Sequence, residues 1–122
     1  MRILVCGGRD YEDYDTLKTV LSSLQVTKGH FTAIIHGDAK GADKLAGRYA
    51  EMHNIPVARF PADWERHGKK AGPLRNKQML AVGKPDLVVA FAGGKGTADM
   101  IHQSKKAGVE IFDAREGGVH GV

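Results

Sequence analysis

Apolar residues fall into short unbroken runs separated by amphipathic stretches. The runs predict five strands, at residues 2–6, 32–36, 56–60, 86–91 and 109–112. The stretches between them carry apolar residues three and four positions apart and predict helices at residues 14–24, 42–53, 74–82 and 97–107. The strands are continuously apolar, so both faces of their sheet are expected to be covered. This order predicts a single α/β Rossmann-like doubly wound domain, with about five mostly parallel strands flanked by helices.

Individual residues mark the expected ends of these helices. Asp13 and Asp15 are both candidates for the cap that starts the first helix. Pro73 is expected at the first position of the third helix, and Gly83 just after its end. Thr97 is expected to cap the start of the last helix.

Length and composition describe one soluble globular domain. The chain has 122 residues, of which 42% are hydrophobic and 26% are charged, values ordinary for folded chains. We expect a domain over residues 1–116 and a flexible glycine-rich tail over residues 117–122. The longest apolar runs are strand-sized and there is no signal-peptide pattern, so no membrane association is expected. Cys6 is the one cysteine, which excludes an internal disulfide and favours the reducing cytoplasm.

The charge balance favours an anionic partner. Eighteen basic and fourteen acidic side chains give a formal net charge of +4, which suits a nucleotide or a nucleic acid. The six histidines are scattered along the chain. His36 and Asp38 would supply only two ligands, so neither a metal site nor a cofactor is expected.

Glycine is concentrated where the predicted strands end. Twelve of the sixteen glycines fall in the segments that follow strands, which share one edge of a doubly wound sheet. Glycine lets backbone N–H groups approach an anion, and the helix N-termini beyond favour negative charge. Tight strand-to-helix turns alone would also explain such glycines. The G-x-G-x-x-G fingerprint and the P-loop are both absent, which argues against a standard dehydrogenase or a P-loop ATPase.

Four blocks of sequence carry a resemblance to a known family. They read GGRD at residues 7–10, HGDAKGAD at 36–43, PADW at 61–64 with GPLRN at 72–76, and AGGKGT at 92–97. In this combination the chain resembles the SLOG superfamily, and within it the YspA or YpsA-related branch. That branch is related to the Lonely-guy phosphoribohydrolases and the Smf DNA-processing proteins. The resemblance implies a Rossmann-like domain that binds a nucleotide or a nucleotide-derived ligand.

The Lonely-guy enzymes provide a guide to possible chemistry. They hydrolyse the N-glycosidic bond of a nucleoside monophosphate, and they carry P-G-G-x-G-T-x-x-E with an upstream R-K pair. By resemblance, Arg75 corresponds to the functional arginine, while Asn76 replaces the lysine and Ala92 the proline. Met100 occupies the position of the catalytic glutamate, which counts against hydrolysis. Asp99 lies one residue earlier, about 100° around a helix, so it is not an automatic substitute.

The candidate ligand-binding residues come from these same blocks. They are Gly7, Gly8, Arg9, Asp10, Gly37, Asp38, Lys40, Gly41, Trp64, Arg75, Asn76, Gly93, Gly94, Lys95, Gly96 and Thr97. Arg75 is expected to clamp a phosphate, with a surface salt bridge as the alternative. Trp64 either stacks on a base or packs over the sheet edge. Should the protein be an enzyme, Asp38, Asp10 and Asp99 are the candidate catalytic carboxylates.

Three functions remain open at this point. The first is binding of a nucleotide as a sensor or sequestering module. The second is N-glycosidic hydrolysis of a nucleoside monophosphate or an NAD-derived nucleotide. The third is DNA binding, supported weakly by the basic run over residues 66–70, which makes nucleic acid the least favoured partner. The resemblance also allows a homodimer, although the sequence shows no interface for one.

Overall fold

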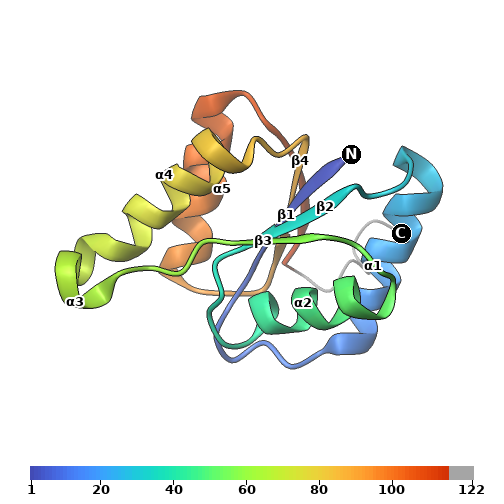
Figure 1. The fold of residues 1–122 in the computed structure, drawn as a ribbon, viewed down its shortest axis with the longest axis horizontal. Coiled ribbons are helices and arrows are strands. Elements are labelled where there is room, and N and C mark those ends of the chain that lie inside the picture. The colour runs from blue at the N-terminus through green and yellow to red at the C-terminus, as the bar shows by residue number, and fades with distance from the viewer. Residues whose placement is uncertain (116–122) are drawn as a thin grey trace.

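The computed structural model describes residues 1–115 and contains one parallel five-stranded sheet (Figure 1). The strands lie in the order β3-β2-β1-β4-β5. They are β1 (Arg2–Cys6), β2 (Ala33–His36), β3 (Val57–Arg59), β4 (Leu87–Phe91) and β5 (Glu110–Ala114). The doubly wound fold is therefore confirmed. The predicted tail, residues 117–122, lies outside the described residues.

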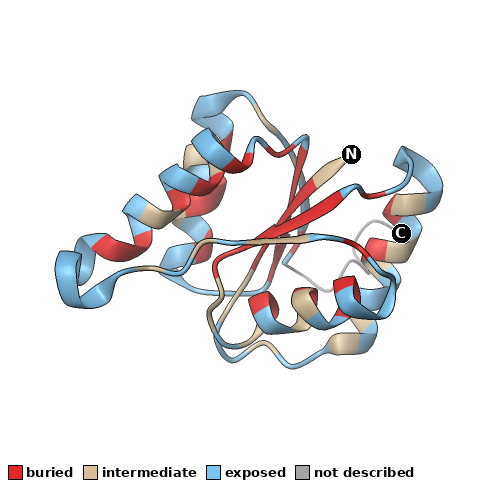
Figure 2. Ribbon diagram, in the orientation of Figure 1, coloured by how far each residue is buried: buried red, intermediate tan, exposed pale blue. Residues whose placement is uncertain are grey.

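Helices cover both faces of the sheet, as the continuously apolar strands require (Figures 1 and 2). On one face lie α1 (Tyr14–Lys28) and α2 (Ala42–Met52); on the other lie α4 (Ala71–Gly83) and α5 (Lys95–Ala107). A short helix, α3 (Trp64–His67), and a 3-10 turn, η1 (Gly68–Lys70), connect β3 to α4 and were not expected.

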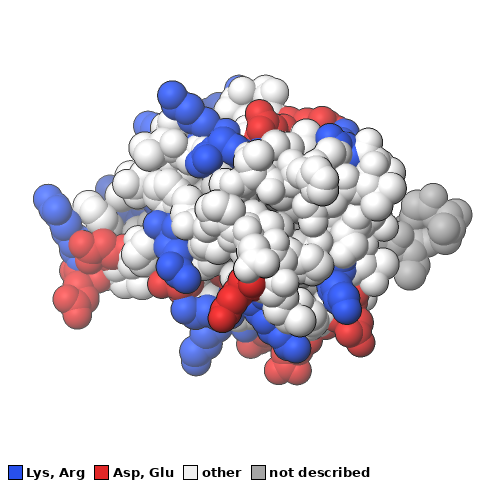
Figure 3. Space-filling model, turned by 45° about the vertical axis from the view of Figure 1, so that its right-hand side comes forward, with Lys and Arg blue, Asp and Glu red and all other residues white. Residues whose placement is uncertain are grey.

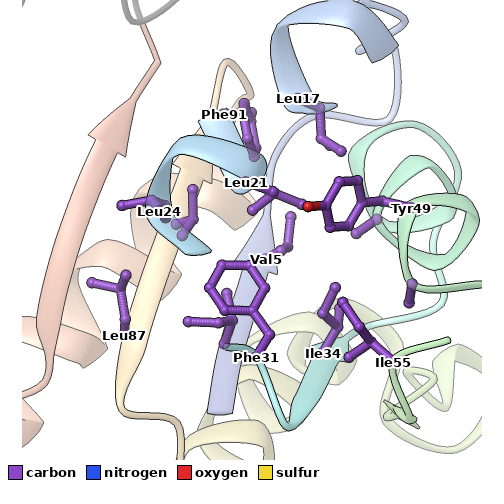
Figure 4. Close-up of a cluster of buried hydrophobic side chains, with 14 of the residues drawn as sticks. Val5, Leu17, Leu21, Leu24, Phe31, Ile34, Tyr49, Ile55, Leu87 and Phe91 are labelled. Atoms are coloured by element: carbon purple, nitrogen blue, oxygen red, sulfur yellow. The ribbon is translucent and has the colours of Figure 1, made fainter. Parts of the chain in front are cut away.

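Alternate residues of each central strand supply the two halves of the core. Val5 and Ile34 face α1 and α2, where they pack with Leu21 and the fully buried Tyr49 (Figure 4). The neighbouring positions face α4 and α5; the cluster there comprises Leu4, Cys6, Ile35, Met79, Val88, Ala90, Met100 and Ile101. Both halves are filled, so the sheet forms a rigid base for the loops at its edge.

One expected helix end is confirmed and others are shifted. Asp13 is the N-cap of α1, with Oδ1 accepting a hydrogen bond from the Thr16 amide at 3.0 Å. Pro73 is the third residue of α4 rather than the first, which the first turn tolerates because its amides have no helical partner. Gly83 is the last helical residue, and Lys84 ends the helix in a left-handed conformation.

The prediction that Thr97 caps α5 is wrong. Gly94 is the N-cap, and Thr97 is the third residue of the helix, with a buried side chain. Here the helix begins directly after the glycine pair, so a side-chain cap is not what starts it.

The loops that follow β1, β2 and β4 hold one another at the carboxyl edge of the sheet. The Gly8 amide donates a hydrogen bond to the Ala92 carbonyl at 2.8 Å, and the Gly8 carbonyl accepts one from the Ala42 amide at 3.1 Å. Gly41 has φ +76°, and a Cβ built there would lie 2.1 Å from the Gly8 oxygen. Only glycine fits both this backbone conformation and this contact.

We expect Gly41→Ala to lower the free energy of unfolding by about 2–4 kcal/mol, because it combines left-handed strain with overpacking. The matched control is Gly108→Ala, at φ +74° with nothing within 4 Å of the added Cβ. It should cost about 1 kcal/mol, from backbone strain alone. Urea unfolding of both variants measures the difference. Equal losses would contradict the proposed loop contact.

Candidate functional site

A cleft of about 940 Å³ lies beyond the carboxyl ends of β1 and β4. These strands are neighbours in the sheet, but the chain leaves β1 toward β2 and returns to β4 on the other side. This is the topological switch point, where the loops of an open α/β sheet diverge and leave room for a ligand.

Most of the predicted site residues meet in this main cleft. Those that line it are Gly7, Gly8, Arg9, Asp10, Trp64, Arg75, Asn76, Gly93, Gly94, Lys95, Gly96, Thr97 and Asp99. A second cleft of about 490 Å³ is lined by Gly37, Asp38 and Lys40 together with Arg9, Asp10, Trp64 and Arg75. Gly41 lines neither cleft; its position is set by the loop contact described above.

The glycine pair after β4 and the start of α5 form one wall of the main cleft. A Cβ on Gly93 would lie 2.6 Å from the Gly8 amide nitrogen, so glycine allows this loop to touch the loop after β1. The Ala98 amide donates to the Gly94 carbonyl at 3.1 Å. The amides of residues 95–97 precede that bond and have no carbonyl of their own helix to reach. Such a helix start favours an anion.

Arg75 projects from α4 toward the loop after β2. Its Nη1 donates to the Gly37 carbonyl at 2.7 Å, and its Nε donates to Asn76 Oδ1 at 3.1 Å. Burial lowers its pKa, while the nearby Asp43 raises it. Within residues 1–115 Arg75 forms no salt bridge, so the alternative of a surface ion pair is not what the structure shows.

Asn76 connects α4 to a carboxylate on α5. Its Nδ2 donates to Asp99 Oδ2 at 2.9 Å and to the Gly96 carbonyl at 3.2 Å. Gln103 Nε2 donates to the same Asp99 oxygen at 2.8 Å. Met100, by contrast, is fully buried in the core. The two positions thus face different surroundings, and it is Asp99 that presents a carboxylate to the cleft.

Trp64 stands between the two clefts and lines both. Its side chain is 46% exposed, and the Arg9 guanidinium carbon lies 5.2 Å from the ring centroid. A Cβ on Gly72 would lie 3.3 Å from Trp64 Cη2, so one edge of the ring packs on α4. The ring therefore packs on the helix and keeps an exposed surface as well.

Asp43 has a role that the sequence did not indicate. Its Oδ2 accepts hydrogen bonds from the Gly37 and Ala39 amides, both at 3.1 Å, which shapes the loop after β2. Burial raises the pKa of this carboxyl to about 6. In the sequence, Asp43 is recognisable only as an acidic residue in the first turn of a helix. That position does not indicate that its side chain is buried.

Two further titratable groups lie at the ends of strands. His36 Nδ1 accepts a hydrogen bond from the Asp38 amide at 2.9 Å, and burial lowers the pKa of His36 to about 4. Burial raises the pKa of the Cys6 thiol, at the floor of the main cleft, to about 12. His36 is thus neutral and hydrogen-bonded, and Cys6 is an inert thiol. Within residues 1–115 no three His, Cys, Asp or Glu side chains gather to hold a metal.

Charges of both signs surround the clefts. Sequence reasoning did not place some residues that line the main cleft: Tyr11, Glu12, Asp13, Lys69, Pro73 and Met79. Lys69 belongs to the basic run noted above, and Asp13 and Pro73 were expected only at helix starts. Tyr11, Glu12 and Met79 carried no signal. On the face shown in Figure 3, basic and acidic side chains interleave and form no continuous basic surface.

Comparisons with known proteins agree with this architecture. The family model of the YspA, cpYpsA-related SLOG family matches residues 1–67. The Gene 61 protein of Mycobacterium phage D29 is 35% identical over an alignment of 119 residues, which covers 92% of this chain and 94% of that protein. The protein is therefore a SLOG-type Rossmann-like domain. Specifically, the chain belongs to the YspA, cpYpsA-related SLOG family.

Two solved structures share the fold. DNA processing protein A (DprA) from Streptococcus pneumoniae matches with a TM-score of 0.72 at 16% identity, covering 92% of this chain and 49% of that chain. Phosphoribosylglycinamide formyltransferase from Coxiella burnetii matches with a TM-score of 0.50 at 17% identity, covering 85% and 47%. The chain thus spans about half the length of each. Among residues 1–115 there is no helix with the length and apolar character needed to cross a membrane.

Asp43 and His36 make the free energy of unfolding depend on pH in opposite directions. Between about pH 4 and 6 native Asp43 keeps a proton that the unfolded chain has lost, so its contribution falls as pH rises. Native His36 lacks a proton that the unfolded chain holds between about pH 4 and 6.5, so its contribution rises with pH. The two slopes oppose each other over the shared range.

We expect Asp43→Asn to remove the falling contribution while keeping an oxygen for the two loop amides. Relative to the native chain, the stability of the variant should rise with pH from 4 to 6, by at most about 1.4 kcal/mol per pH unit. Urea unfolding at several pH values measures this slope. Asp15→Asn, at an exposed position, is the control for the loss of one surface carboxylate. Parallel curves for Asp43→Asn would show that Asp43 titrates normally.

Proposed function

We propose that this protein binds a nucleotide or a nucleotide-derived ligand in the main cleft, as a sensor or a sequestering module. The proposal rests on one observation: arginine side chains without a salt bridge in residues 1–115 line the same cleft as backbone amides that have no helical partner. Arg75 and Arg9 line the same cleft as the start of α5, and neither forms a salt bridge within residues 1–115. A phosphate group satisfies both the guanidinium groups and the amides.

The rest of the cleft suits the other parts of a nucleotide. Asp99 Oδ2 is occupied by two amide donors, while Oδ1 accepts no hydrogen bond from residues 1–115 and is available to a ribose hydroxyl. The exposed surface of Trp64 provides an aromatic platform for a base. A volume of about 940 Å³ lies within the range of small-molecule sites. Membership of the SLOG family supports a nucleotide-related role.

Binding without turnover is the favoured outcome because Met100 lies in the core. In the Lonely-guy pattern this position carries the catalytic glutamate, and here it presents only an apolar side chain to the sheet. A domain that has lost this acid but keeps its phosphate-binding loops is suited to hold a nucleotide intact.

Arg75→Ala is expected to weaken nucleotide binding by about 10- to 100-fold, because a charge-assisted hydrogen bond to phosphate contributes roughly 1.5–3 kcal/mol. Trp64 is the single tryptophan and lines the cleft, so its fluorescence reports binding directly. Lys77→Ala is the matched control: it removes an exposed charge from the same helix and outside both clefts.

Arg75→Lys separates charge from geometry. It keeps the positive charge but cannot form a bidentate contact, so its loss should fall between those of the other two variants. Thermal unfolding checks that each variant folds. Equal affinities for Arg75→Ala and Lys77→Ala would remove Arg75 from the site.

A second candidate function is N-glycosidic hydrolysis, and the position of Asp99 favours it. The carboxylate lines the main cleft and is oriented by two side-chain amides, as a group that stabilises an oxocarbenium-like transition state would need to be. Asp38 is less suited, because Lys44 Nζ lies 2.7 Å from its Oδ1 and Asp38 lines only the second cleft. Asp10 lines both clefts.

If the protein is a hydrolase, Asp99→Asn should reduce base release by about 100-fold or more. Nucleotide binding should persist, because the asparagine oxygen still accepts from Asn76. Mass spectrometry of nucleoside monophosphates incubated with the protein detects the free base. Asp10→Asn serves as the comparison. Intact nucleotide after long incubation with the native chain would exclude hydrolysis of the substrates tried.

A further inference from the structure

The second cleft adjoins the main cleft along a common wall. Its outer side is formed by residues 37–40 of the loop after β2 and by Pro61 and Ala62 before α3. The residues that line both clefts are Arg9, Asp10, Ala39, Trp64 and Arg75. The two clefts therefore form one depression in two parts, of about 940 and 490 Å³.

Two arginines mark the boundary between the parts. Arg9 is placed over the Trp64 ring, with 5.2 Å from the guanidinium carbon to the ring centroid. Arg75 is held from the other side by the Gly37 carbonyl at 2.7 Å, and a Cβ on Gly37 would lie 2.0 Å from its Nη1. Both arginines line both clefts. Burial lowers the pKa of Arg75, Asp43 raises it, and repulsion from Arg9 lowers it.

Of the acidic residues near this boundary, Asp10 lines both clefts, while Asp38 and Asp43 are engaged elsewhere. Asp38 pairs with Lys44, and Asp43 accepts hydrogen bonds from two backbone amides. Lys40 adds a further positive charge on the outer side of the second cleft. Arg9 and Arg75 line the same boundary, and neither forms a salt bridge within residues 1–115, so this boundary favours a ligand with negative charge.

We propose that the ligand is a nucleoside diphosphate that carries a second group beyond its diphosphate. This inference rests on the proposed function and names the class of ligand. The nucleoside occupies the main cleft, the diphosphate crosses the boundary between Arg9 and Arg75, and the second group fills the second cleft. A mononucleotide would leave that cleft and its cations unused. Two phosphates offer enough oxygens for both guanidinium groups at once.

The experiment compares three ligands for each base by Trp64 fluorescence and by calorimetry. For each base these are the monophosphate, the diphosphate and a substituted diphosphate: ADP-ribose, GDP-mannose, UDP-glucose or CDP-choline. For the preferred base, the substituted diphosphate should bind the native chain at least about 10-fold more tightly than the plain diphosphate, by about 1.4 kcal/mol.

Ala62 provides the matched pair of variants, because it lines only the second cleft and is itself half-buried. Ala62→Phe fills the cleft and should remove the 10-fold advantage while leaving the affinity for the plain diphosphate unchanged. Ala62→Ser leaves the cleft open and should preserve both affinities. Lys40→Ala tests the second cleft independently of Ala62, because it removes a positive charge from an exposed position that lines the same cleft. It should weaken binding of the substituted diphosphate. Urea unfolding confirms that each variant is folded.

The failures of the two proposals are distinguishable. Binding of plain and substituted diphosphates with equal affinity, or equal weakening of both by Ala62→Phe, overturns the two-part ligand and leaves nucleotide binding intact. Tighter binding of an eight-residue single-stranded oligonucleotide than of any substituted diphosphate also overturns it. Failure of every nucleotide to bind the folded native chain overturns the proposed function itself.

Discussion

The site depends on one residue, Gly8, whose backbone joins three loops. Its amide bonds to the loop after β4 and its carbonyl bonds to the start of α2, so the carboxyl ends of β1, β2 and β4 are held together. Gly41 and Gly93 have no side chain, which allows these contacts to form. The main cleft lies above this junction, and its shape is therefore a consequence of backbone packing more than of side-chain choice.

Around that rigid junction the polar side chains are positioned from the helices. Asn76 lies between Arg75 and Asp99, so one amide group orients both a cation and an anion that line the main cleft. This arrangement keeps the two charges apart and available. A cation and an anion in one cleft are the basis for proposing a ligand that has both a phosphate and hydroxyl donors, as a nucleotide does.

Much of the fold could be predicted from the sequence, because five apolar runs in a βα alternation admit few topologies. The positions of the glycines predicted which edge of the sheet carries the candidate site. Residues 64–70 could not be predicted as helical, since they are polar and have no apolar periodicity. The inward turn of Asp43 and the contribution of Lys69 to the cleft arise from tertiary contacts, which leave no local pattern. The prediction that Thr97 caps α5 was wrong because a polar residue near the start of a helix is not always its N-cap.

The central pairing of β1 with β4 joins segments far apart along the chain, with Ile3 aligned to Leu87. A ribosome must therefore release most of the polypeptide before this pairing can form, and long-range parallel pairing is slow to nucleate. The main cleft is lined by the loops after both β1 and β4, so it is complete only when these two strands are paired. A ligand that binds this cleft would therefore stabilise newly completed chains by mass action.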